Sequence, residues 1–218
     1  MLSYLSTTSV DDLEVGDLGF TSIRGRVGAG VLAGQTSIDL AALLRGRRVE
    51  NAGWITHAFI VTDATRDGAA QIVEAMPSGA RAVRMERGGV GQHEPRVGPG
   101  FAYVRLRPWA GPPGWRGVAA GAAEQMIGTR YGFAQYAALA ALTATGGDAA
   151  SARGPLARYV NRRHPVTGLP LQVICSQLVD EALRIAGVHL FEDGRPPQYV
   201  TPGALFWRAA KLGDVSIC

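Results

Sequence analysis

The order of secondary structure along the chain limits the possible folds more than any other feature of the sequence. Strand-forming runs fill the first half, and helix-forming runs follow a loop rich in glycine and proline. The predicted strands cover residues 18–23, 54–62, 71–76, 80–85 and 101–106, and the predicted helices cover residues 115–127, 131–144, 150–162, 171–186 and 202–212. Strands followed by helices favour an α+β fold over an alternating α/β fold.

The length of the chain predicts a single domain. Its 218 residues are enough for one sizeable hydrophobic core, and no obvious linker divides them. We therefore expect one domain over residues 1–218, with a helical region at about 108–170. The strands of the first half are close enough in sequence to be joined as antiparallel hairpins.

Composition and charge narrow the choice of partners. Hydrophobic residues make up 47% of the chain and charged residues 18%, which is typical of a globular protein. The net charge is +4, but the arginines are scattered and do not alternate with aromatic residues, so no nucleic-acid partner is predicted. The longest apolar stretch, at about 133–144, is shorter than the roughly 20 residues that cross a bilayer, so no integral membrane segment is expected.

The start of the chain predicts residence in the cytoplasm. Residues 1–6 include no basic start, long apolar stretch or small-residue cleavage site, so a signal peptide is not indicated. A phage-encoded protein, or delivery by another route, is the alternative. No His or Cys pair has the spacing of metal ligands, and neither a metal nor a cofactor is expected. The sequence leaves the oligomeric state open.

Cys175 is the candidate nucleophile. It lies in the run VICSQLVD, and Pro170 places it within the first turns of the predicted helix. A helix N-terminus carries partial positive charge and unpaired N–H groups, which favour a thiolate and are suited to an oxyanion. The alternative is a core cysteine, because Cys175 shares a helix face with Leu178 and Val179.

His57 and Glu74 are the candidate base and its orienting carboxylate. Each lies on the apolar side of a predicted strand, where a polar side chain needs a partner. A hairpin loop of residues 63–68 would place His57 directly opposite Glu74, with about 5 Å between their Cβ atoms. The alternatives are a structural histidine and a surface carboxylate. Nucleophile, base and carboxylate together are more specific than any one of them.

Four segments of the sequence resemble the circularly permuted branch of the NlpC/P60 papain-like superfamily, the YiiX/YebB-like group. They are Gly16-Asp17-Leu18-Gly19-Phe20, Thr56-His57-Ala58-Phe59-Ile60-Val61, Val73-Glu74-Ala75 and Ile174-Cys175-Ser176-Gln177-Leu178-Val179. In this branch the histidine strand precedes the cysteine helix, as it does here. The resemblance implies an antiparallel sheet packed against the cysteine helix, with Cys175, His57 and Glu74 as the catalytic residues.

Residues 25–48 do not align with that family. The segment is rich in glycine at first, and Thr36-Ser37 then predicts the start of a helix. Gly28-Ala29-Gly30-Val31-Leu32-Ala33 fits a permissive dinucleotide-binding pattern. No β-α-β repeat follows it, so we do not expect a nucleotide site.

The residues and the resemblance together predict a cysteine-dependent hydrolase of the peptidase or amidase type. It would act through a thioacyl intermediate on a small peptide, amide or acyl substrate, for example a cell-wall peptide. An acyltransferase or an ester acyl hydrolase on the same fold is the alternative, because these enzymes share that intermediate. A catalytically silent binding module is a further alternative.

Overall fold

The structure is a computed structural model that describes residues 4–5, 12–23, 25–44, 46, 49, 52–64, 69–86, 101–134, 137–138, 158–159, 161–193, 195 and 197–217. These residues form an α+β fold in which a mostly antiparallel sheet is packed against helices. The predicted fold class is therefore confirmed at this level. Parts of the predicted helices 131–144 and 150–162 lie outside the described residues.

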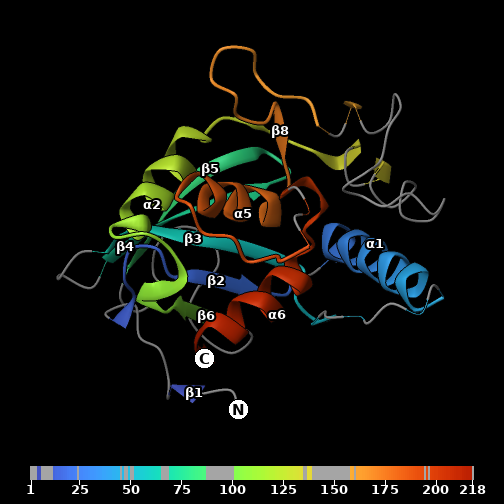
Figure 1. The fold of residues 1–218 in the computed structure, drawn as a ribbon. Coiled ribbons are helices and arrows are strands. Elements are labelled where there is room, and N and C mark those ends of the chain that lie inside the picture. Colours follow the sequence, from blue (N-terminus) through green and yellow to red (C-terminus); the bar gives the residue numbers. More distant parts are fainter. Residues whose placement is uncertain are drawn as a thin grey trace.

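One twisted sheet forms the centre of the molecule, with strand order β1-β9-β6-β2-β3-β4-β5 (Figure 1). Its strands are β1 (Tyr4–Leu5), β2 (Leu18–Thr21), β3 (His57–Ala64), β4 (Ala69–Met76), β5 (Gly79–Glu86), β6 (Phe101–Leu106) and β9 (Gly213–Ile217). All neighbouring strands are antiparallel except β1 and β9. The predicted strands from residue 18 to residue 106 are confirmed, with small differences at their ends, whereas β1 and β9 were not predicted.

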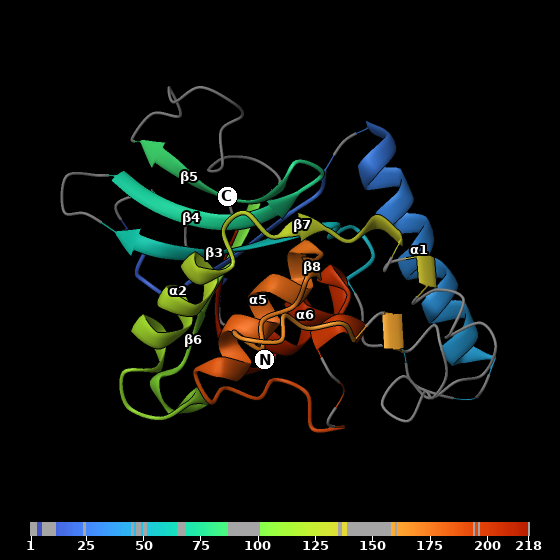
Figure 2. The same cartoon turned by 90° about the horizontal axis from the view of Figure 1, so that it is seen from above.

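The helices α2 (Trp115–Gln125), α5 (Cys175–Ile185) and α6 (Pro202–Leu212) lie on the same side of the sheet (Figure 2). Buried side chains from these helices form the main core with one face of β2, β3 and β6. A smaller apolar cluster, which includes Phe59 and Tyr103, covers the other face of the same strands. The central strands are buried on both faces, so side chains near their ends can form a site without solvent.

Among the described residues of the segment around 108–170, 133–134, 137–138 and 158–159 are helical as predicted, whereas two other stretches are not helical. Helix α2 is confirmed, but Arg130–Tyr131 forms a short strand, β7, that pairs in parallel with β8 (Gln172–Val173). Residues 161–170 form turns and an isolated bridge between Arg163 and Pro170. Pro170 and Gly168, whose φ is +68°, break the helical pattern there.

Helix α1 (Gly25–Leu43) corrects the prediction for the segment that resisted alignment. The helix includes the glycine-rich run, so the dinucleotide-like pattern lies inside a helix rather than in a phosphate-binding loop. Thr36 and Ser37 do not cap a helix start. Their hydroxyls donate to the carbonyls of Leu32 and Ala33, one turn earlier, at 2.9 Å each. Threonine and serine hydroxyls can cap a helix start or bond to a carbonyl one turn earlier inside a helix. The same two residues therefore suit both positions, and the helix start was predicted wrongly.

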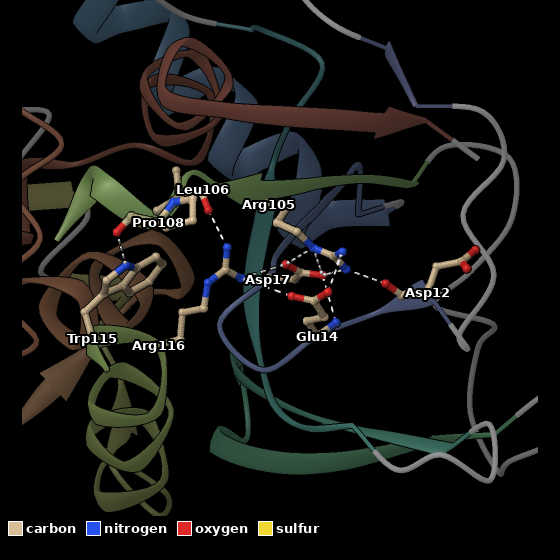
Figure 3. A network of polar contacts seen from close by, with 8 residues as sticks. All are labelled: Asp12, Glu14, Asp17, Arg105, Leu106, Pro108, Trp115 and Arg116. Atoms are coloured by element: carbon tan, nitrogen blue, oxygen red, sulfur yellow. Dashed lines mark hydrogen bonds and ion pairs between the residues drawn. The ribbon is translucent and has the colours of Figure 1, made fainter. Parts of the chain in front are cut away.

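The Gly16-Asp17 segment has a structural role. Gly16 has φ +87°, a conformation that glycine adopts readily, and a Cβ atom there would lie 2.9 Å from Arg116 Cβ. The carboxylate of Asp17 is buried and accepts hydrogen bonds from Arg105 Nε and Nη2 at 3.0 and 2.8 Å (Figure 3). Arg116 Nη1 lies 3.3 Å from the same carboxylate. This ion-pair cluster attaches the turn that precedes β2 to strand β6 and helix α2.

Replacing Asp17 with Asn should destabilise the protein by roughly 2 kcal/mol, because two arginines would lose their buried counter-charge. Urea unfolding at neutral pH measures the effect. Asp193→Asn is the matched control, since Asp193 and Arg195 form an exposed pair that should contribute less than about 1 kcal/mol. Equal effects of the two substitutions would contradict the structural role of Asp17.

Candidate active site

The β3–β4 hairpin brings His57 and Glu74 together. His57 Nε2 lies 2.8 Å from Glu74 Oε2, and both side chains are fully buried. The predicted contact is therefore present, but the predicted register is wrong. Glu74 pairs with Phe59, two positions from His57. Beside the hairpin loop, Ala64 pairs with Ala70 rather than with residue 67, a shift of three positions. The bulge between Val61 and Asp63 offsets one of them, and the remaining shift of two leaves both side chains on the same face.

Arg81 completes the environment of the carboxylate. It lies directly opposite Glu74 on β5, and its Nε and Nη2 donate to Glu74 Oε1 at 3.0 and 2.8 Å. The Arg81 side chain is 41% exposed, so it extends from solvent to a carboxylate that has no exposure. Glu74 therefore keeps a charge balanced on one side by arginine while its other oxygen faces the imidazole.

Cys175 is the first residue of α5, at the helix N-terminus. The predicted helix of residues 171–186 begins four residues too early, because β8 precedes it. The Cys175 thiol donates to the carbonyl oxygen of Thr56, with 3.9 Å between Sγ and O. Thr56 immediately precedes β3, so the nucleophile candidate reaches the beginning of the histidine strand. Only 2% of Cys175 is exposed.

Thr56 fixes the position where strand and helix meet. Its N–H donates to the carbonyl of Thr21 at 3.0 Å, and its hydroxyl accepts from the N–H of Ile23 at 2.7 Å. The end of β2 thereby holds the backbone beside both Cys175 and His57. The sequence did not single out Thr56, and its contribution comes mainly from backbone groups, which leave no side-chain signal.

The electrostatics of His57 follow from this environment. Complete burial lowers its pKa, but interactions with the Cys175 thiol and with Glu74 outweigh burial and raise the pKa from 6.5 to about 9. The site therefore holds a protonated imidazole over the neutral pH range. The Nδ1 atom is buried and makes no hydrogen bond to any described residue, so it is available for proton exchange.

A second buried polar group without a hydrogen-bond partner lies at the start of α5. The Oε1 atom of Gln177 accepts the N–H of Ile174 at 3.4 Å, which caps the helix. Its Nε2 atom is buried and makes no hydrogen bond within the described part of the chain. Unpaired buried donors are rare in folded proteins, and this one lies beside the candidate nucleophile in sequence.

Two residues of the site, Arg81 and Gln177, were not predicted from the sequence. Arg81 was detectable, because a tight turn after Met76 pairs residue 76 with Gly79 and hence Glu74 with Arg81. Gln177 occupies the third position of the helix, where Gln is a known capping residue. That signal was readable once the helix start was placed at Cys175.

A cavity of about 560 Å³ lies on the opposite side of α5 and is separate from these residues. It is lined by Arg163, Gly168, Asp180, Arg184, Val188, His189, Leu190, Phe191, Arg195 and Pro197. Burial and the neighbouring Glu181 raise the pKa of Asp180 from 3.8 to about 7, although Arg195 and Arg184 oppose the shift. Its lining residues include no cysteine, serine or threonine.

No protein-family model matches the chain, and a search of curated proteins finds no significant match. Among the described residues, no group of three or more His, Cys, Asp or Glu side chains is placed to hold a metal ion. No helix in the described ranges is long and apolar enough to cross a membrane. The function must therefore be argued from the site.

A titration of His57 followed by NMR should show a midpoint near pH 9. Glu74→Gln and Cys175→Ser should each lower it, because burial then acts with less opposition. The interactions that raise the pKa of His57 also stabilise the folded state. This contribution is complete below about pH 6.5 and is lost as pH rises to about 9, so wild-type stability should fall in that window more than Glu74→Gln stability. A wild-type midpoint at or below 6.5 would contradict the arrangement.

Asp180→Asn should stabilise the protein at alkaline pH. The pKa of Asp180 is higher in the folded state than its usual 3.8, so its contribution is complete in acid and is lost as pH rises through about 7. The variant should gain roughly 4 kcal/mol at pH near 8 and almost nothing near pH 4. Urea unfolding at both pH values checks this, and a pH-independent gain would contradict it.

Proposed function

We propose that this protein is a cysteine-dependent acyl hydrolase in which Cys175 is the nucleophile, His57 the base and Glu74 the orienting carboxylate. The observation that carries the proposal is the buried 2.8 Å contact between His57 and Glu74, with the His57 Nδ1 atom unpaired and the Cys175 thiol beside the ring. This arrangement supplies the three functions that nucleophilic thiol catalysis requires.

In the proposed resting state, the proton of the Cys175 thiol has already passed to His57 Nδ1, because the raised pKa of His57 favours a thiolate beside an imidazolium. The resulting imidazolium is stabilised by Glu74 through Nε2–H, and Arg81 keeps Glu74 charged. The thiolate attacks the substrate carbonyl carbon. N–H groups of the first turn of α5, which have no acceptor within the helix, receive the oxyanion, and Gln177 Nε2 is a further donor at that end.

The second step releases the leaving group. The imidazolium returns its proton to the departing amine or alcohol as the tetrahedral intermediate collapses, leaving an acyl group on Cys175 as a thioester. His57 then deprotonates a water molecule, which attacks the thioester, releases the acid product and restores the thiolate–imidazolium pair. These steps use no metal or redox partner, and every proton transfer passes through the imidazole of His57.

The favoured substrate is a peptide or amide, in keeping with the resemblance to the permuted NlpC/P60 branch. The chain order of His57, Glu74 and Cys175, and an antiparallel sheet against the cysteine helix, support that family assignment. Burial of all three side chains favours a second candidate, acyl transfer to an amine or alcohol, because a dry site protects a thioester from water.

An activated ester tests the nucleophile. Cys218, the other cysteine of the sequence, is first replaced with serine so that Cys175 is the single thiol. In this background, 4-nitrophenyl acetate should give a burst of nitrophenolate and an acetyl adduct that mass spectrometry maps to Cys175. Cys175→Ser should abolish the adduct, and His57→Gln should slow its formation by about 10²–10⁴-fold. Glu74→Gln should slow it less, because it misorients the base without removing it.

His164→Ala is the matched control, since His164 is an exposed histidine outside the site and its removal should change nothing. Adding an amine acceptor distinguishes hydrolysis from transfer by the product formed. The proposal fails if Cys175 acquires no adduct, or if His57→Gln forms the adduct at the wild-type rate. A catalytically silent binding module would then be the better interpretation.

A further inference from the structure

Helix α1 presents an apolar surface that no described part of the protein covers. It lies at the edge of the molecule, beside the sheet and the other helices (Figures 1 and 2). Three leucines of the helix and the leucine after it define what we call the leucine face: Leu32, Leu40, Leu43 and Leu44 are 43%, 55%, 59% and 80% exposed. Exposed leucines gathered on one element are a mark of an interaction site.

The leucine face is continuous along the helix. At 100° per residue, positions 32, 36, 40 and 43 fall on one side, with position 44 at its margin. The polar residue within it is Thr36, and its hydroxyl is bonded at 2.9 Å to the carbonyl of Leu32. Its polar group is therefore satisfied inside the helix, and the surface it adds is largely apolar.

The opposite side of α1 is anchored to the domain. Gln35 is 1% exposed, and its Nε2 donates to the carbonyl of Ile55 while its Oε1 accepts the N–H of Gly203, both at 2.9 Å. Val31, one turn earlier, is buried as well. These contacts fix the rotation of the helix, so its leucines stay on the outer side.

The sequence at both ends of the helix is cationic. Arg24 and Arg26 lie at its beginning and Arg45, Arg47 and Arg48 follow its end, while Asp39 is the only acidic residue from 24 to 48. Two copies of α1 paired in either direction would therefore bring arginine-rich ends together. That repulsion disfavours a second copy of the chain and favours an anionic surface.

We propose that the leucine face of α1 docks on the surface of an anionic lipid bilayer. The leucines would enter the boundary between headgroups and acyl chains, with the helix lying in the membrane plane, and the flanking arginines would meet anionic headgroups. This is peripheral binding, consistent with the finding that no described helix is suited to span a membrane. It is independent of the chemistry proposed for Cys175.

Co-sedimentation with vesicles tests the proposal. The full chain should bind vesicles of mixed phosphatidylcholine and phosphatidylserine, bind pure phosphatidylcholine more weakly, and detach as salt is added. The double variant Leu40→Ser, Leu44→Ser should bind the mixed vesicles at least about tenfold more weakly. Circular dichroism and urea unfolding establish that the variant remains folded.

Val118→Ser and Val166→Ser are the matched controls, because these valines are 52% and 86% exposed on other elements and should not affect binding. Cys175→Ser should bind like wild type. The proposal is overturned if mixed vesicles are not bound at low salt, or if the leucine and valine variants bind alike. It is also overturned if light scattering shows a dimer that only the leucine variant loses, without vesicle binding.

Discussion

The hydrogen bond between His57 and Glu74 is made without any solvent exposure, and the rest of the site depends on it. A carboxylate in such a place is stable only when both of its oxygens have partners. Arg81 satisfies one oxygen of Glu74, and the histidine satisfies the other. The hairpin register that provides both contacts is thus an energetic requirement as well as a geometric one.

The nucleophile is positioned by a different set of constraints. Helix α5 packs its apolar side on the sheet, and its first residue, Cys175, meets the beginning of β3 at Thr56. A hydrogen bond from its N–H to the carbonyl of Thr21 and one from the N–H of Ile23 to its hydroxyl hold Thr56 in place. Strand, helix and neighbouring strand therefore converge at one point, although the residues involved are far apart in the sequence.

The sequence predicted which strand faces carry His57 and Glu74, because alternation has a period of two and survives an even shift in register. It did not predict the shift, since neither the end of the hairpin at Ala64 and Ala70 nor the bulge at residues 61–63 is set by composition alone. Helix α1 was misread because Thr36 and Ser37 suit both a cap and a helix interior. Strand β9 follows α6 directly, and its pairing with β6 and β1 reveals it.

Arg81 joins the buried carboxylate to the outside of the protein. A dicarbonyl reagent that modifies guanidinium groups need not enter the site to reach the exposed part of this side chain. Neutralising it would leave Glu74 with a weaker counter-charge, and the carboxylate would pull harder on the imidazole proton. The basicity of His57 is therefore open to adjustment from the surface, by chemistry on a residue that never touches the thiol.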